Sequence, residues 1–154
     1  MDATRVLVRD GEAVFDRLVE LFDEYRVHYG EEADPARTAA WLAAQLRTGR
    51  LRASVAERDG RGIGFLTSVV MPASLRLGEF WAVRDVFVRP DCRRSGAGRA
   101  LVEQVLAEAR AAGAVRVSLQ TEPENTAALA LYRSIGFRPV EGLTGLSLSL
   151  AGQL

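Results

Sequence analysis

The sequence predicts an α/β protein with a mixed sheet, formed by a single domain over residues 1–154. Three observations predict this class. The chain has 154 residues, a length typical of one domain. Strand-like segments in its middle are joined by short connections, which favours antiparallel pairing. The strand–helix–strand unit that follows requires a parallel pair with a right-handed crossover.

The first part of the chain predicts two helices and three strands. Residues 4–9 alternate apolar and polar side chains, which is typical of a strand. Residues 11–30 carry apolar side chains at three- and four-residue spacing, which predicts an amphipathic helix. The segment 34–49 begins with an Asp-Pro pair, a cap followed by a proline suited to the first helical position. Residues 51–57 and 62–71 are strand-like and flank RDGRG, which predicts a hairpin.

The second part of the chain alternates strands and helices. Residues 80–88 form a long strand-like run, and residues 96–112 follow with apolar side chains on one helical face. A strand is predicted at 115–121 and a helix at 125–136. Two short strand-like segments come last, at 137–140 and 145–150. The predicted order is therefore β-α-α-β-β-β-α-β-α-β-β.

Composition excludes several classes of protein. The formal net charge is zero and the isoelectric point is about 6.6, without the basic stripe that nucleic-acid binding requires. No apolar run approaches the roughly 20 residues of a membrane span, and the N-terminus lacks the pattern of a signal peptide. Cys92 is the only cysteine, which fits a reducing compartment, so we expect a cytoplasmic protein without a membrane partner. No histidine, cysteine or carboxylate cluster has metal-ligand spacing, and no metal is predicted.

The turn RRSGAGR, residues 93–99, joins a strand to a helix. The first N–H groups of a helix lack intrahelical partners and carry partial positive charge. Gly96 and Gly98 leave room for an anion, and three arginines add charge, so the turn suits a phosphate or pyrophosphate. The spacing matches neither G-x-G-x-x-G nor a P-loop. The alternative is a tight packing turn with its arginines in solvent.

Two segments resemble the motifs of the GNAT superfamily of N-acetyltransferases. Residues 86–109, VFVRPDCRRSGAGRALVEQVLAEA, resemble motif A, whose core Q/R-x-x-G-x-G/A is filled here by residues 93–98. Residues 121–141, TEPENTAALALYRSIGFRPVE, resemble motif B, in which an Asn precedes a helix that carries LY and ends in GF. Motif-level resemblance covers about residues 80–140. It implies a GNAT-like fold in which the fourth and fifth strands part to form a cleft.

The resemblance implies acetyl-CoA as co-substrate. The backbone of the glycine turn would hold the pyrophosphate, and the end of the strand 80–88 would pair with the pantetheine arm. A backbone N–H at Val88 or Val86 would stabilise negative charge on the acetyl oxygen. The residues implied in cofactor binding are Val86, Phe87, Val88, Arg93, Arg94, Ser95, Gly96, Ala97, Gly98, Arg99 and Asn125.

Catalytic residues are implied in the same way. Tyr132 lies where many superfamily members have the acid that protonates the leaving thiolate, and a core aromatic is the alternative reading. Alkyl amines are ammonium ions at pH 7, so a proton acceptor is needed as well. Asp85 and Glu79 are candidate bases, together with Glu122; surface carboxylates are the alternative. Arg84 stands where diamine acetyltransferases have a Glu, which leaves the base unassigned.

The strand 80–88 raises a question of orientation. With a period of two, Asp85 shares a face with Val83, and Arg84 shares the other face with Val86. Asp85 and Arg84 would enter one pocket only if a bulge intervenes. Arg84 could also bind a carboxylate or phosphonate of the acceptor.

The acceptor is expected to be a small-molecule amine, such as an amino acid, an amine or an amine-bearing antibiotic. Tyr25, His28 and Tyr29 lie in the region that forms the acceptor lip in the superfamily, and with Arg84 they are the candidate acceptor site. Two alternatives stay open: a CoA-binding module without catalysis, and acetylation of protein N-termini or lysines. The superfamily commonly forms dimers, and the segment 145–150 could pair across chains in a homodimer.

Overall fold

A computed structural model of the protein describes residues 4–7 and 12–151. The chain divides into two compact units, Met1–Thr121 and Glu122–Leu154, and each is described by itself. Residues 8–9 of the first predicted strand and residue 11 of the first predicted helix lie outside the described residues. Among the residues described, no helix is long and apolar enough to cross a membrane.

The first unit contains one five-stranded sheet in the order β1-β2-β3-β4-β5. Strands β1 to β4 pair antiparallel in sequence order, and β5 pairs parallel to β4 after the α3 crossover. The mixed sheet predicted from the sequence is confirmed. The bounds are β1 Thr4–Leu7, α1 Ala13–His28, α2 Pro35–Arg47, β2 Arg52–Arg58, β3 Arg61–Ala73, β4 Gly78–Val88, α3 Ala97–Ala111 and β5 Val117–Ser118, with 3-10 turns at Ser74–Arg76 and Pro90–Cys92.

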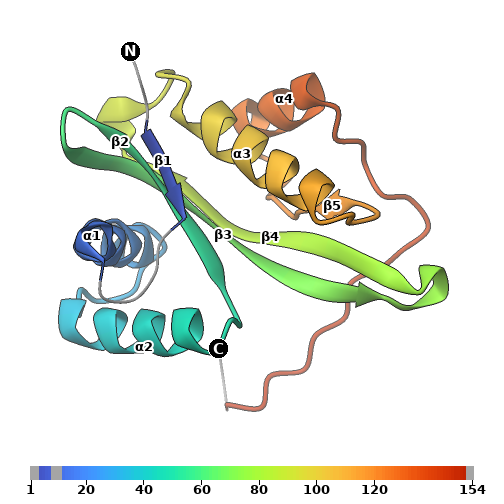
Figure 1. The fold of residues 1–154 in the computed structure, drawn as a ribbon, viewed down its shortest axis with the longest axis horizontal. Coiled ribbons are helices and arrows are strands. Elements are labelled where there is room, and N and C mark those ends of the chain that lie inside the picture. Colours follow the sequence, from blue (N-terminus) through green and yellow to red (C-terminus); the bar gives the residue numbers. More distant parts are fainter. Residues whose placement is uncertain (1–3, 8–11, 152–154) are drawn as a thin grey trace. The chain divides into compact units, whose positions relative to one another are not determined.

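Helices α1 and α2 cover one face of the sheet, and α3 covers the other (Figure 1). The α1 face holds the main apolar cluster, in which buried helix residues meet inward residues of β2, β3 and β4. On the other face, α3 buries the apolar stripe that its 3.6-residue period predicts. The cluster on the α1 face comprises Val14, Leu18, Leu21, Phe22, Leu42, Ala53, Val55, Phe65 and Phe87.

Asp23 ties α1 to the start of α2 from a buried position. Its Oδ1 accepts hydrogen bonds from the Asp34 N–H at 3.0 Å, the Thr38 hydroxyl at 2.8 Å and Arg26 at 3.2 Å. Asp34 in turn caps α2, as predicted, by accepting from the Arg37 N–H at 3.1 Å. Burial alone would raise the pKa of Asp23, but these hydrogen bonds and the charge of Arg26 outweigh it, and the pKa is lowered.

The second unit contains α4, Thr126–Ile135. The Asn125 side chain caps it by accepting from the Ala128 N–H at 3.2 Å, and the helix ends at Gly136, whose φ is 121°. The strands predicted at 137–140 and 145–150 are not formed in the described part of this unit, so that part of the predicted order was wrong. The side chains of Leu146, Leu148 and Leu150 are almost fully exposed, at 94%, 84% and 93%. Alternation selects a face for such a segment but supplies no neighbouring strand to pair with.

Replacing Asp23 with Asn should lower the free energy of unfolding by about 2 kcal/mol at pH 7, because three donors lose their anionic acceptor. A lowered folded-state pKa stabilises the protein above the unfolded-state value of about 3.9, and this contribution disappears as pH falls through the folded-state pKa. The difference between wild type and D23N should therefore shrink between pH 5 and pH 3 in urea unfolding. Asp16→Asn, an exposed carboxylate on α1, is the matched control. An undiminished difference at pH 3 would contradict this account.

Candidate active site along strand β4

Strand β4 contains one residue more than β3 opposite it. Thr67 pairs with Asp85, but the next residue, Ser68, pairs with Val83. Arg84 is therefore the extra residue of a β-bulge, and its side chain is exposed. Bulges of this kind shift the alternation of a strand by one residue.

The bulge reverses the edge to which the backbone N–H groups point. The Trp81 N–H donates to the Arg116 carbonyl, next to β5, at 3.0 Å. The Arg89 N–H donates to the Ile63 carbonyl of β3 at 2.9 Å. Residues eight apart in a regular strand would point to the same edge, so the extra residue accounts for the change. By alternation, Val86 and Val88 turn their N–H groups toward the edge on the β5 side.

That edge is only briefly covered by β5. The ladder between the two strands consists of Trp81↔Val117 and Ala82↔Ser118, and in the described chain it goes no further. Beyond Ala82, β4 continues for six residues to Val88 along this edge. The two strands thus pair at one end of β4 and not at the end that precedes the glycine turn.

The bulge also corrects the orientation expected for Asp85. A regular strand would place Asp85 and Val83 on one face. Val83 lies opposite Ser68, which lines a shallow depression with Val105 and Glu108 of α3. The Asp85 carboxylate instead accepts a hydrogen bond from Tyr25 of α1. Asp85 and Val83 therefore face opposite sides of the sheet, because Arg84 adds a residue between them.

Two hydroxyl groups hold the Asp85 carboxylate. The Tyr25 hydroxyl donates to Oδ1 at 2.9 Å, and the Thr67 hydroxyl donates to Oδ2. Thr67 is fully buried in β3. Sequence reasoning missed Thr67, since no motif marks it; the only available sign was a hydroxyl-bearing residue within a mostly apolar predicted strand.

Aromatic side chains gather beside this carboxylate at the end of α1. The ring centroid of Tyr25 lies 5.1 Å from that of Tyr29 and 5.8 Å from that of Phe87. The His28 ring lies 5.2 Å from Tyr29 and 6.1 Å from Phe87. The structure thus brings the three predicted acceptor residues together at the end of α1, where Tyr25 bonds Asp85 and where His28 and Tyr29 are exposed.

Arg89 fastens the end of β4 to α1, and sequence reasoning did not single it out. Its guanidinium bonds Glu20 at 2.8 Å and Glu24 at 2.9 and 3.0 Å, while Arg89 itself is 6% exposed. Burial alone would lower the pKa of Arg89, but the hydrogen bonds and charges of both glutamates outweigh it, and the pKa is raised. The strand end that leads into the glycine turn is therefore fixed to the same helix that contacts Asp85.

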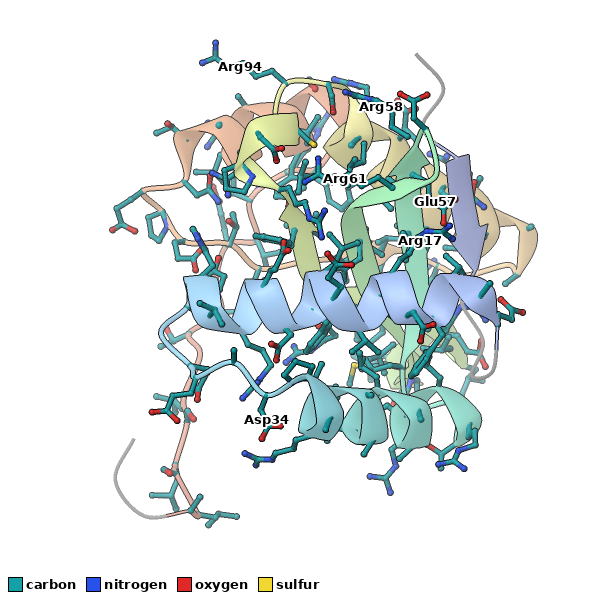
Figure 2. The ribbon with its side chains drawn as sticks, turned by 90° about the vertical axis from the view of Figure 1, so that its left-hand side faces the viewer. Arg17, Asp34, Glu57, Arg58, Arg61 and Arg94 are labelled. Carbon is teal, nitrogen blue, oxygen red and sulfur yellow. The ribbon has the colours of Figure 1, made fainter. Side chains whose placement is uncertain are left out.

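The glycine turn itself begins α3 with unusual backbone conformations. Arg94 has φ of 63° and Gly96 has φ of 84°, both in the left-handed region. A Cβ at Gly96 would meet no atom within 4 Å, so glycine is required by conformation and the space above it is open. Arg94 extends away from the sheet, at the end of the molecule that also carries Arg58 and Arg61 (Figure 2). Exposed arginines around a helix N-terminus of this form suit an anion.

Neighbouring groups complete the turn. The Ala97 N–H donates to the Ser95 hydroxyl at 3.4 Å, and Arg93 donates to the Val88 carbonyl at 3.3 Å. Arg99 lies 3.4 Å from Glu103, one helical turn on. In the described residues, no group of three or more histidine, cysteine or carboxylate side chains could hold a metal ion.

The remaining predicted site residues lie elsewhere. Glu79 is opposite Pro72, six residues before Asp85, or about 20 Å along an extended strand. The structure therefore does not bring Glu79 and Asp85 together. Asn125 and Tyr132 belong to the second unit, where Asn125 caps α4. Tyr132 is buried with its ring centroid 5.9 Å from that of Phe137.

Removing the two glutamates that bond Arg89 should lower the free energy of unfolding more than removing Arg89 itself. Replacing both Glu20 and Glu24 with Ala leaves a buried cation unpaired, which should cost about 3 kcal/mol. Arg89→Met should cost about 1 kcal/mol, since the glutamate side chains, 64% and 43% exposed, return to water. Urea unfolding at pH 7 measures both. Glu103→Ala, which breaks the exposed pair with Arg99, is the control, and a larger loss in R89M than in the double variant would contradict the explanation.

Known proteins that are similar to this chain in sequence and in fold include acetyltransferases. The family model described as "Acetyltransferase (GNAT) family" matches residues 15–137. An uncharacterized N-acetyltransferase, YhfO, of Bacillus subtilis (strain 168) is 30% identical over 86% of this chain and 89% of its own length. An IAA acetyltransferase of Azospirillum brasilense is 33% identical over 79% of this chain and 77% of its own. The crystal structure of a probable acetyltransferase superposes with a TM-score of 0.88 at 28% identity, covering 97% of this chain and 99% of that chain. The chain therefore belongs to the GNAT family of N-acetyltransferases.

Proposed function

We propose that this enzyme transfers the acetyl group of acetyl-CoA to a primary amine of a small molecule. One observation carries the proposal: the bulge at Arg84 turns the N–H groups of Val86 and Val88 to an edge of β4 that β5 does not cover. The same strand ends at a glycine turn with an anion-binding form. A donor edge followed directly by an anion site fits a long ligand with an amide-bearing arm and a pyrophosphate.

The residues of the glycine turn fit the pyrophosphate of CoA. Gly96 leaves open space where a side chain would stand, and the first N–H groups of α3 follow it. Arg93, Arg94 and Arg99 supply positive charge, and Ser95, Ala97 and Gly98 complete the turn. Along the strand, Val86, Phe87 and Val88 would hold the pantetheine arm through backbone groups. The motif resemblance adds Asn125 to this set.

Each catalytic role can be assigned to a group of this chain. Acetyl-CoA supplies an activated thioester. An N–H of Val86 or Val88 donates a hydrogen bond to the acetyl oxygen as negative charge develops there. Asp85 binds the ammonium group of the acceptor at the face of the sheet that α1 covers and accepts one of its protons, so that the neutral amine can bond to the acetyl carbon as the C–S bond breaks. The motif resemblance makes Tyr132 the proposed donor of a proton to the thiolate sulfur as it leaves.

The amine class is supported by the surroundings of Asp85. The carboxylate accepts a hydrogen bond from Tyr25, whose ring lies against the exposed Tyr29, which in turn contacts His28. A cationic head and an apolar or aromatic body would both find partners here. Arg84, exposed at the bulge, is placed to meet an anionic group on the acceptor.

The deciding experiment measures acetyl-CoA binding by calorimetry and thiol release against a panel of amines. The panel contains amino acids, polyamines, aminoglycosides, arylalkylamines and peptides with a free N-terminus. Acetyl-CoA binding together with thiol release for a small amine is expected. Absence of binding would overturn the proposal, and binding without release for any amine would favour a CoA-binding module. Release confined to the peptides would favour a protein acetyltransferase.

Gly96→Glu should weaken acetyl-CoA binding by at least about tenfold, because a carboxylate at a helix N-terminus competes with the pyrophosphate. Gly49→Glu is a matched control, since Gly49 also has a positive φ, 72°, and also has no atom within 4 Å of an added Cβ. Both variants carry the same backbone strain and the same charge. Calorimetry should separate them clearly, and equal affinities would remove the glycine turn from the proposed site.

Tyr132→Phe should lower kcat by about 100-fold, since it removes a proton donor to the leaving group, while the KM for acetyl-CoA stays unchanged. The ring and its contact with Phe137 are retained, so the thermal midpoint should be nearly that of the wild type. Steady-state kinetics over a range of pH provide the measurement. A wild-type kcat and pH profile in Y132F would assign Tyr132 a packing role only.

A further inference from the structure

The Asp85 carboxylate is oriented by hydrogen bonds from two protein hydroxyl groups, which a carboxylate in solvent does not need. Both of its oxygens accept hydrogen bonds, one from a helix and one from a neighbouring strand. A carboxylate has about four lone-pair positions, of which these two bonds use two. The side chain is only partly buried, so a ligand can still reach it.

Packing fixes each donor. Thr67 is 0% exposed and lies directly opposite Asp85 in the β3–β4 ladder. The Tyr25 ring packs edge-on against Phe65, with ring centroids 5.4 Å apart, and lies 5.8 Å from Phe87. These ring contacts hold the Tyr25 side chain in the position from which its hydroxyl donates to the carboxylate. The orientation of the carboxylate is therefore determined by the fold before any ligand binds.

The direction of these hydrogen bonds decides what kind of ligand fits. Each hydroxyl has one hydrogen, and each donates it to Asp85. What the carboxylate still offers is acceptor capacity and negative charge. The group that completes the site must therefore be a donor, and a primary ammonium, with three N–H bonds and a positive charge, answers both requirements.

We propose that Asp85 is the anchor for the ammonium group of the acceptor, and that Tyr25 and Thr67 are positioning residues that act through it. This inference rests on the proposed function for its substrate class, but binding of the ammonium group requires neither acetyl-CoA nor turnover. Tyr25, expected from the sequence to touch the acceptor, acts instead through Asp85. Thr67 has the same role from the opposite side.

The test compares two probes that differ in one group. 2-Phenylethylamine is cationic at pH 7, whereas 2-phenylethanol has the same body without the charge, and its ring can meet the exposed rings of His28 and Tyr29. Dissociation constants are measured by amide NMR titration of the whole protein without acetyl-CoA. The wild type should prefer the amine by at least about tenfold, and Asp85→Asn should abolish the preference.

Positioning is tested with paired variants. Tyr25→Phe and Thr67→Val should each reduce the preference for the amine severalfold, while Thr67→Ser, which restores a hydroxyl, should recover it. Ser68→Ala is the matched control: it removes a buried hydroxyl from the adjacent residue of β3, which faces α3. Thermal unfolding of every variant separates loss of preference from loss of fold.

The outcomes divide cleanly. Equal affinity of the wild type for both probes would overturn the anchor. Loss of preference in D85N with full preference in both Y25F and T67V would overturn the positioning roles. Failure of acetyl-CoA binding or thiol release, with the amine preference intact, would refute the proposed function and leave the ammonium site standing.

Discussion

The extra residue at Arg84 is the constraint on which the rest of the site depends. A strand has two alternations, one of side-chain faces and one of backbone edges, and a single added residue inverts both at once. The inversion sends the Asp85 side chain to the α1 face and the N–H groups of Val86 and Val88 to the β5 edge. A regular strand would have placed Asp85 beside α3 and turned those two N–H groups toward β3.

Helix α1 is attached to the same strand by two polar contacts, at Asp85 and at Arg89, with the Phe87 ring between them. Beyond the bulge, every second residue faces α1: Asp85 and Phe87 in β4, and Arg89 directly after it. Tyr25 contacts the first two, and Glu24, its neighbour in the helix, bonds Arg89. Polar contacts of this kind are directional, whereas apolar packing alone tolerates sliding. The attachment therefore sets the position of α1 along β4, and with it the position of the aromatic residues at the end of the helix.

Patterns local in sequence predicted most of the fold. The cap at Asp34, the glycine turn and the order of the elements through α4 all depend on residues a few positions apart. The bulge was not predictable, because residues 80–88 read as one continuous strand and only the register with β3 reveals the extra residue. Thr67 was missed for the same reason: its importance comes from a residue 18 positions away. The strands expected after α4 were wrong for a related reason. The alternation of Leu146, Leu148 and Leu150 predicts which side chains would share a face, but it does not show that a neighbouring strand is there to pair with.

The backbone edge of β4 and its α1 face have different proposed roles, which explains why the family is easier to recognise from the sequence than the acceptor is. In the proposed site, Val86 and Val88 bind the cofactor through their backbone and the glycine turn binds it through its conformation, so that few side chains are constrained and those few form a short motif. The proposed acceptor site depends on side chains of α1, β3 and β4, which lie 18 or more positions apart in the sequence and converge only in the folded unit. Substrate choice can then change by substitution on the α1 face, as at Asp85, while the donor edge of the same strand keeps its geometry. In the proposed function, one bulged strand thus contributes its backbone edge to the cofactor and its side chains to the acceptor at adjacent residues.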